Sequence, residues 1–472
     1  MKNLIIPIEI KHRELQGAIV LSYIALKRGW TVYLGQKSQI FPFIKFFSKS
    51  IWFLKSIVPG ELSNLLKIKS FDHKITTLDV EGLILSNGKF GAIKRYSLAT
   101  IKEADIIFFW GDKSHYEPVA KVFPSIKHKS IISGSPIIDG WHYEKLNFLN
   151  QTKSTDNFKK TILISVNFAR ADPNFKFARK VYEKFYSGFY NYKKNELDSY
   201  NNLIEAEYKL KEVSFLHFKD IIPKISKKFS ECRIIVRPHP EENLDFWKKY
   251  LSTYKNVIIE NQKSTSSQLL ISDIFIHFNS TMSIQSCYFD KITLMFNPIK
   301  ETSLNDAISP ITQDVSIICK DVKELFKNIA NPDHKIMKTK KKKIKNYIRY
   351  LDNNNNLLSS ELIINQIDKI NIKTNNSKNR LNSIYSIISY TNFNLKFFIL
   401  FCLGSLSIII PFLRKRFERF RWRYVLGKKK WDKTSKKYLF DYFFSLIKDK
   451  EFQNKLVIKK HFGGFFILKL DK

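Results

Sequence analysis

The sequence predicts an α/β protein with two domains, each built around a parallel sheet. Three observations support this prediction. The chain has 472 residues with 44% hydrophobic composition, which is enough to bury two cores. It opens with a strand–helix–strand pattern. Short apolar runs that end in polar loops then recur through both halves, as expected for parallel strands covered on both faces.

Residues 1–150 are predicted to form the first domain. A strand over Leu4–Ile10 precedes a helix over Leu15–Arg28, which Gly29 ends, and a second strand follows over Thr31–Leu34. Two further strands are expected over Ala104–Trp110 and Ser130–Ser133. All of these elements fit one doubly wound unit.

The polar stretch Asn150–Asn157 is expected to be the hinge to a second domain over residues 151–370. This domain begins with a strand over Thr161–Ser165, and the helical periodicity of Phe175–Ser230 predicts a long helical pair. The remaining expected elements are strands over Ile234–Val236, Ile274–His277 and Val315–Cys319, and a helix over Val322–Ile329.

The strongest functional signal lies where two strands of the second domain end. One strand stops at Arg237-Pro238-His239-Pro240 and another at Asn279-Ser280-Thr281. Ligands bind beyond the carboxyl ends of such strands. The two prolines stiffen the loop that carries His239, and Ser280 or Thr281 is expected to cap a phosphate-binding helix through about Tyr288. The alternative is a turn histidine and an ordinary helix cap.

The first domain offers a second group of charged candidates. Glu9, Arg13 and Glu14 flank its first loop, where a pair of charges at a helix start on a solvated face is the alternative account. Asp79 and Glu81 stand just before Gly82. A carboxylate there is placed to act as a general base at the edge of a cleft, although a surface turn explains it equally well.

Composition narrows the class of partner. The net charge is +37, from 80 Lys and Arg against 43 Asp and Glu, which favours anionic partners. No glycine-rich dinucleotide or P-loop motif occurs, and no nucleic-acid motif supports a nucleic-acid partner. The four scattered cysteines indicate a reducing compartment and argue against disulfides and a thiolate zinc site. No signal peptide is expected, because Glu9 interrupts the apolar start Leu4–Ile8.

Residues 381–472 are predicted to form a basic, hydrophobic helical tail. Phe397–Leu413 is almost wholly apolar, but its 17 residues are at the lower limit of the ~17–25 that span a bilayer. Arginines interleaved with aromatic residues follow directly, over Arg414–Tyr424. This pattern suits an in-plane or shallowly inserted anchor at an anionic membrane surface, and a buried helical hairpin is the alternative.

Several segments, taken in order, resemble the bacterial surface carbohydrate (surface polysaccharide) biosynthesis proteins, which are similar to two-domain, GT-B-type nucleotide-sugar glycosyltransferases. The resemblance covers most of residues 1–300 and none of the tail after residue 380. The matching segments are Pro7–Leu15, Arg28–Lys37, Leu78–Leu83, Phe108–Asp112, Ser133–Asp139, Ile162–Phe168, Arg237–Glu242 and Ile276–Thr281.

The chain is also similar to bacterial sialyltransferase-like enzymes in three motifs. In those families a carboxylate-carboxylate-glycine motif supplies the catalytic base, while a His-Pro motif and a later Ser-Ser or Ser-Thr motif hold the donor's nucleotide phosphate. The resemblance places these motifs at Val80-Glu81-Gly82, His239-Pro240 and Ser280-Thr281. Because Val80 stands where a carboxylate is expected, the base would be Glu81 or, second, Asp79.

The resemblance extends to other positions, with two more departures. Arg237 and Gly134 are expected on the donor-phosphate side. Gln285 stands where the family tends to carry a glutamate that contacts the donor sugar or ribose, and Asp290-Lys291-Ile292 replaces a Gly-Lys-Pro turn. These departures concern donor identity and activity.

The resemblance therefore implies transfer of a sugar from a nucleotide donor to a hydroxyl of a lipopolysaccharide or capsule glycan, or its lipid-linked form. Glu9, Arg13 and Glu14 would lie on the acceptor side. No cofactor is expected, and the absence of Asp-x-Asp argues against a metal. The implied location is the cytoplasm, peripheral at the inner face of the cytoplasmic membrane. The alternatives are a polyol-phosphate transferase or nucleotide-sugar epimerase on the same fold, or a catalytically lapsed glycan- or membrane-binding assembly protein.

Overall fold

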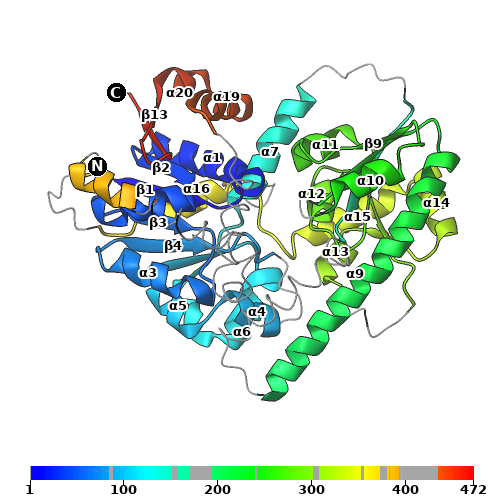
Figure 1. Ribbon diagram of the computed structural model, residues 1–472, viewed down its shortest axis with the longest axis horizontal. Helices are drawn as coiled ribbons and strands as arrows, with labels where there is room; N and C mark the ends of the chain where they lie inside the picture. The colour runs from blue at the N-terminus through cyan, green and yellow to red at the C-terminus, as the bar shows by residue number, and fades with distance from the viewer. Residues whose placement is uncertain are drawn as a thin grey trace.

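The computed structural model has the predicted fold class, with two α/β domains built on separate sheets of mainly parallel strands (Figure 1). It describes residues 2–471 except 84–88, 151–157, 169–193, 240–241, 301–303, 305–307, 352–355, 373–379, 382, 393–394, 396–398 and 400–433. The predicted hinge at residues 150–157 lies almost entirely outside the described residues.

The first sheet has the strand order β13-β14-β2-β1-β3-β4-β5-β6. Its first six strands along the chain run parallel, and they are β1 (Asn3–Ile8), β2 (Thr31–Gln36), β3 (Ile51–Leu54), β4 (Lys74–Leu78), β5 (Ile106–Phe109) and β6 (Ser130–Ile132). All six residues of β1 are buried, because helices cover both faces of the sheet. This explains the unbroken apolar run at the start of the sequence.

The helices of the first domain form two layers around this sheet (Figure 1). They are α1 (Lys11–Lys27), α2 (Lys37–Ile40), α3 (Leu62–Lys69), α4 (Lys89–Arg95), α5 (Leu98–Glu103), α6 (Glu117–Val122) and α7 (Pro136–Leu149), with a 3₁₀ helix over Phe41–Phe46. Helices α1 and α7 pack on one another, and α3 packs on α5.

The second sheet has the strand order β12-β11-β10-β7-β8-β9, and all its strands are parallel. The chain starts in the middle at β7 and winds outward first on one side and then on the other, which is the Rossmann order. The strands are β7 (Thr161–Val166), β8 (Arg233–Pro238), β9 (Val257–Ile259), β10 (Ile274–His277), β11 (Ile292–Phe296) and β12 (Ile317–Cys319).

Seven described helices accompany the second sheet: α9 (Lys194–Lys228), α10 (Leu244–Tyr250), α11 (Thr265–Ile271), α12 (Met282–Tyr288), α13 (Pro310–Asp314), α14 (Val322–Ala330) and α15 (His334–Ile344). Where the sequence predicted a long helical pair, the described part of the chain holds the single 35-residue helix α9, and residues 169–193 lie outside the description.

The chain then returns to the first domain. Helix α16 (Ser359–Ile367) packs against α1 and α7, although the sequence placed it within residues 151–370 of the second domain. The buried Asp139 carboxylate of α7 accepts hydrogen bonds from the backbone N–H groups of Ser359 (3.0 Å) and Ser360 (2.6 Å), and from the Ser360 hydroxyl (2.7 Å). The buried Asp139 carboxylate thus accepts the hydrogen bonds of the first residues of α16.

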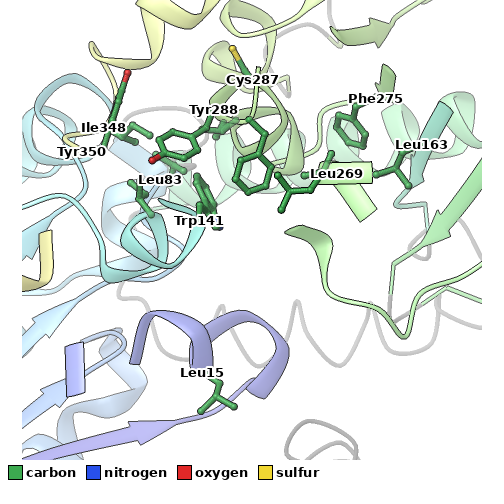
Figure 2. Close-up of a cluster of buried hydrophobic side chains, with 14 of the residues drawn as sticks. Leu15, Leu83, Trp141, Leu163, Leu269, Phe275, Cys287, Tyr288, Ile348 and Tyr350 are labelled. Carbon is green, nitrogen blue, oxygen red and sulfur yellow. The ribbon is translucent and has the colours of Figure 1, made fainter. Parts of the chain in front are cut away.

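Aromatic side chains fill the junction between the halves (Figure 2). The Tyr288 ring of α12 lies 5.9 Å from the Trp141 ring of α7 and 5.5 Å from the Tyr350 ring, measured between centroids. Lys145 of α7 also forms an ion pair with Asp290, with Nζ and Oδ2 2.5 Å apart. The sequence segment SGSPIID, which contains Asp139, therefore begins the helix that joins the two domains.

The end of the chain corrects the prediction of a helical tail over residues 381–472, because it also contains strands. Helices α19 (Lys436–Leu446) and α20 (Lys450–Lys455) are followed by the hairpin of β13 (Leu456–Lys460) and β14 (Phe466–Leu470), which pairs antiparallel with β2. Alternate residues of these strands are buried in the first domain. The predicted anchor Phe397–Leu413 lies outside the described residues apart from Ile399. Among the residues that the structure describes, no helix is both long enough and apolar enough to cross a bilayer.

Candidate functional site

The first sheet gathers charged side chains at its carboxyl edge. Strands β1 and β3 are neighbours, and the direction of winding reverses between them, which is where α/β sheets bind ligands. Glu9 follows β1 and Lys55 follows β3, and their side chains form an ion pair. Glu9 and Lys55 therefore mark the switch point of the first sheet.

Asp79, directly after β4, is buried and bound by other groups of the protein. Its side chain is 1% exposed. Arg95, at the end of α4, binds it in a two-pronged ion pair, with Nε 2.6 Å from Oδ2 and Nη2 against Oδ1. The backbone N–H of Glu81 also donates to Oδ1 (2.9 Å). Asp79 thus stabilises the conformation of the loop after β4. It is a weaker candidate than Glu81 for contact with a substrate.

Whereas Asp79 is buried, Glu81 reaches solvent, with a side chain 43% exposed. Its two oxygens pair with Arg95 Nη1 (2.7 Å) and Arg13 Nη2 (2.9 Å). Burial raises the pKa of Glu81, but the opposing charges, led by Arg95 and Arg13, lower it to about 2. A carboxylate with so low a pKa is ionised at neutral pH and is a weak base while these pairs persist.

Arg13 and Glu14 play different parts. The Glu14 carboxylate accepts hydrogen bonds from the backbone N–H groups of Glu9 (2.9 Å) and Ile10 (3.1 Å), so it satisfies donors where α1 begins. Burial raises the pKa of Glu14, against the charges of Lys55 and Arg13. Glu14 is therefore buried and structural rather than part of a solvated face, whereas Arg13 links α1 to Glu81.

His115 is a component of this edge that the sequence argument missed. It is wholly buried, its Nδ1 accepts a hydrogen bond from the Trp110 backbone N–H (3.3 Å), and its Nε2 lies 2.7 Å from the Tyr96 hydroxyl. Burial lowers the pKa of His115 to about 4, so the ring is neutral and supports the segment that carries Arg95. A Cβ on Gly82 would lie 2.2 Å from this ring, which explains why the motif ends in glycine.

In the second domain, His239 follows β8 at the carboxyl edge, as predicted. It is half-buried, and its backbone N–H donates to the carbonyl of Val166 at the end of β7 (2.9 Å). The neighbouring Glu242 accepts hydrogen bonds from the Phe168 backbone N–H and from Trp247 Nε1 (3.2 Å). The RPHPEE segment is thus tied to the loop after β7, which fixes where His239 stands.

Arg237 contacts its own chain. Its Nη1 donates to the Lys263 carbonyl (2.8 Å) and to Gln268 Oε1 (2.5 Å). Burial lowers the pKa of Arg237 to about 10, which leaves the guanidinium charged at neutral pH. These contacts hold the segment before α11 against β8. That Arg237 binds the donor phosphate stays a prediction.

Ser280 and Thr281 separate into a structural and an exposed position. Asn279 has a positive φ of 48°, which turns the chain sharply after β10. Ser280 is buried, and its Oγ accepts a hydrogen bond from the Met282 backbone N–H (3.3 Å), whereas the exposed Thr281 makes no side-chain capping bond. Ser280 therefore supplies the capping hydrogen bond at the start of α12, and Thr281, the N-cap residue, is exposed and supplies none.

This difference predicts opposite outcomes for two alanine substitutions. Ser280→Ala removes a helix-capping acceptor and should lower the free energy of unfolding by about 1 kcal/mol. Thr281→Ala should change it by less than about 0.5 kcal/mol, because an exposed side chain is lost. Urea unfolding curves measure both. Equal losses for the two variants would contradict the assignment of the cap to Ser280.

Two other predicted donor-side residues are occupied by protein contacts. Gln285 is buried on α12 and its Nε2 donates to the Ser266 hydroxyl (2.6 Å). Gly134 follows β6 with a positive φ of 77°, and a Cβ there would lie 2.3 Å from the Arg349 carbonyl oxygen and from Ser359 Oγ. Gly134 thus gives room to the segment that returns from the second domain.

The structure accordingly brings together Glu9, Arg13, Glu14, Asp79 and Glu81 on the first sheet. It places His239 and the Ser280-Thr281 pair at the carboxyl ends of β8 and β10, which both flank β7. Within the described part of the chain, no group of three or more His, Cys, Asp or Glu side chains is arranged to hold a metal ion.

Comparisons with known proteins found similarity only at the level of structure. No family model and no curated protein sequence matches the chain. Similar solved structures include S. aureus MnaA with UDP (TM-score 0.46, 11% identity), which covers 78% of this chain and 96% of that one. UDP-GlcNAc 2-epimerase from Neisseria meningitidis bound to UDP-GlcNAc (0.45, 13%) covers 78% and 100%. The wall teichoic acid polymerase TagF with CDPG (0.42, 12%) covers 78% and 88%.

At these identities and TM-scores, the fold assignment rests on the strand orders of the two sheets and not on the likenesses. Those strand orders and the polar carboxyl edges define the class: a two-domain α/β protein with two Rossmann-like units.

Proposed function

We propose that the protein is an enzyme that transfers a sugar from a nucleotide donor to a hydroxyl of a surface-polysaccharide glycan. The observation that supports this best is the position of the polar groups. His239 and Thr281 stand at the carboxyl edge of the second sheet, beside the point where its winding reverses between β7 and β10. Nucleotides bind at such points.

On the donor side, His239 and the backbone around Thr281 would contact the phosphates of the leaving nucleotide. An imidazole and a nearby hydroxyl supply hydrogen bonds to the negative charge that grows on the departing phosphate. The tie between the His239 backbone and Val166 preorganises that side chain. Stabilisation of a leaving group often contributes most of the rate in group transfer.

On the acceptor side, Glu81 is the better candidate for the base, because Asp79 is enclosed by Arg95. With a pKa of about 2, Glu81 can take a proton efficiently only if the acceptor displaces Arg13 or Arg95 from its oxygens. We therefore propose that the acceptor binds where Arg13 now contacts Glu81. Loss of the Arg13 ion pair on binding would move the pKa of Glu81 upward.

The first test is nucleotide binding. CMP, CDP, UDP and GDP should be compared by thermal shift. We expect one of them to stabilise the protein by about 2.7 kcal/mol at a hundredfold excess over its Kd. His239→Ala and Thr281→Ala should each reduce that stabilisation, because they remove side chains from the carboxyl edge of the second sheet.

His128→Ala is the control, because it removes an exposed histidine of the first domain that lies just before β6, away from the second sheet. It should leave the nucleotide response unchanged. No response to any of the four nucleotides in folded protein would contradict the proposal. A response that survives both His239→Ala and Thr281→Ala would move the donor site elsewhere.

One observation favours a second candidate, a glycan- or nucleotide-binding protein without transfer activity. Both carboxylates after β4 are ion-paired, and Gln285 is buried against Ser266. Product analysis separates the candidates. The donors to test are the sugar and polyol-phosphate derivatives of whichever nucleotide binds. A transferase or epimerase forms product that Glu81→Gln abolishes, whereas a binding protein forms none.

A further inference from the structure

A helix over residues 384–392 lies on the outer flank of the first domain, on the side away from the second domain, and is orange in Figure 1. One side of it is anchored. Its buried Ser386 hydroxyl donates to the Ser383 carbonyl (2.7 Å), and the Tyr390 ring packs 5.2 Å from the Phe43 ring. Just before the helix, the Arg380 backbone N–H donates to the Phe46 carbonyl (3.0 Å).

The opposite side of this helix is apolar and exposed. Ile384 is 67% exposed and Ile388 is 51% exposed. A spacing of four residues places Ile384 and Ile388 on one face of the helix over residues 384–392. We call Ile384 and Ile388 the outward stripe.

The outward stripe inverts the usual pattern of a surface helix, which turns its polar side to water. Two other exposed apolar residues of the helix, Tyr385 (75%) and Ile387 (47%), flank it. Phe462, in the β13–β14 loop, is also exposed, and it lies on the anchored side of the helix, where its ring is 6.0 Å from that of Tyr390. Large apolar side chains exposed together on one helix mark a docking site.

Charge indicates what covers it. In the sequence, Glu418 is the one acidic residue between Asp368 and Asp432, while lysines and arginines are frequent there. Lys45 and Lys460 are exposed on segments that border the helix. A second copy of the chain would bring these cations against each other, whereas anionic lipid headgroups complement them.

We propose that the first domain docks on an anionic lipid bilayer through the outward stripe, with the helix lying in the plane of the membrane surface. Apolar side chains enter the acyl boundary while the flanking cations meet headgroups, as in in-plane amphipathic helices. This docking does not depend on the transfer activity proposed above. It adds a surface on the folded domain to the apolar and basic segment that follows in the sequence.

The test is sedimentation of the full chain with vesicles of phosphatidylcholine containing phosphatidylglycerol. The double variant Ile384→Glu, Ile388→Glu should bind these vesicles about tenfold more weakly, because it places two carboxylates in the apolar contact. Leu98→Glu, Leu216→Glu is the matched control, since both leucines are 63% exposed but lie on α5 and α9. The control should bind as the unsubstituted chain does.

Three results would overturn the proposal. The stripe variant could bind vesicles as tightly as the control. The unsubstituted chain could bind vesicles of phosphatidylcholine alone equally well. It could also be a dimer that the stripe variant dissociates while vesicle binding is unchanged, which would make the stripe an interface between copies. An unaltered thermal midpoint of the stripe variant verifies its fold, and its nucleotide response tests the catalytic proposal separately.

Discussion

Arg95→Ala should lower the free energy of unfolding by about 3–5 kcal/mol, which is the cost of leaving a buried carboxylate without its partner. Asp79 is 1% exposed and receives two nitrogens of this arginine. The side chain of Arg95 is itself only 16% exposed, so water cannot replace it freely. The same substitution removes one of the two ion pairs of Glu81. Urea unfolding at neutral pH measures the loss.

The control for this prediction is Arg28→Ala. Arg28 also pairs with an aspartate, Asp368, at 3.7 Å, but its side chain is 49% exposed. An exposed ion pair contributes less than about 1 kcal/mol. The double variant Arg95→Ala, Asp79→Ala should lose less than the sum of the two single losses, because it leaves no unpaired charge. Equal losses for Arg95→Ala and Arg28→Ala would show that Asp79 gains little from its partner.

The sequence predicted most strands of the two sheets from their apolar runs, but it missed the equally apolar β3 and β9, and it missed β4, where polar side chains lie inside the sheet. The strands at the start, the middle and the end of the predicted scheme are present as β1, β2, β5, β6, β7, β8, β10 and β12. Strand β4 was not predicted, because Thr76 and Thr77 are polar residues of a kind usually found at the surface. Both are buried, and their hydroxyls donate to the carbonyls of Trp52 (3.4 Å) and Leu54 (3.0 Å) in β3.

The sequence predicted where the candidate site residues lie better than it predicted what each of them does. The rule that ligand groups follow parallel strands located His239, Glu81 and Glu9 at carboxyl edges. It could not reveal which polar residues the protein uses for itself. Arg95 lies 16 residues beyond Asp79 in the sequence, and only the packing of α4 brings them together. The same holds for the interdomain tie, because nothing in the sequence links Asp139 to Ser360.

Asp139→Ala should cost about 3 kcal/mol or more, because it removes the acceptor of three hydrogen bonds at the buried start of α16. Ser359 and Ser360 are both fully buried, so their N–H groups gain no water in exchange. Asp333→Ala is the matched control. It removes an exposed cap that accepts from the Lys335 and Ile336 N–H groups at 2.9 Å each, for which about 1 kcal/mol is expected.

The same carboxylate gives the protein a pH dependence of defined sign. Burial raises the pKa of Asp139 to about 6, against the hydrogen bonds from Ser360 and Ser359 that lower it. The folded protein therefore binds a proton at this site that the unfolded chain has released above about pH 4. Its contribution is present below that pH and is lost as the pH rises through about 6.

Asp139→Asn cannot ionise, so it should lack this decline in unfolding free energy, which amounts to about 3 kcal/mol between about pH 4 and pH 7. Comparing the two proteins at each pH removes the contributions of all other titrating groups. A difference that does not change with pH would mean that water reaches Asp139 and that burial does not govern its ionisation. A difference that changes as expected would show that the return of the chain to the first domain rests on a carboxylate that is costly to charge. Protonation of Asp139 below about pH 6 would then stabilise the contact between α7 and α16.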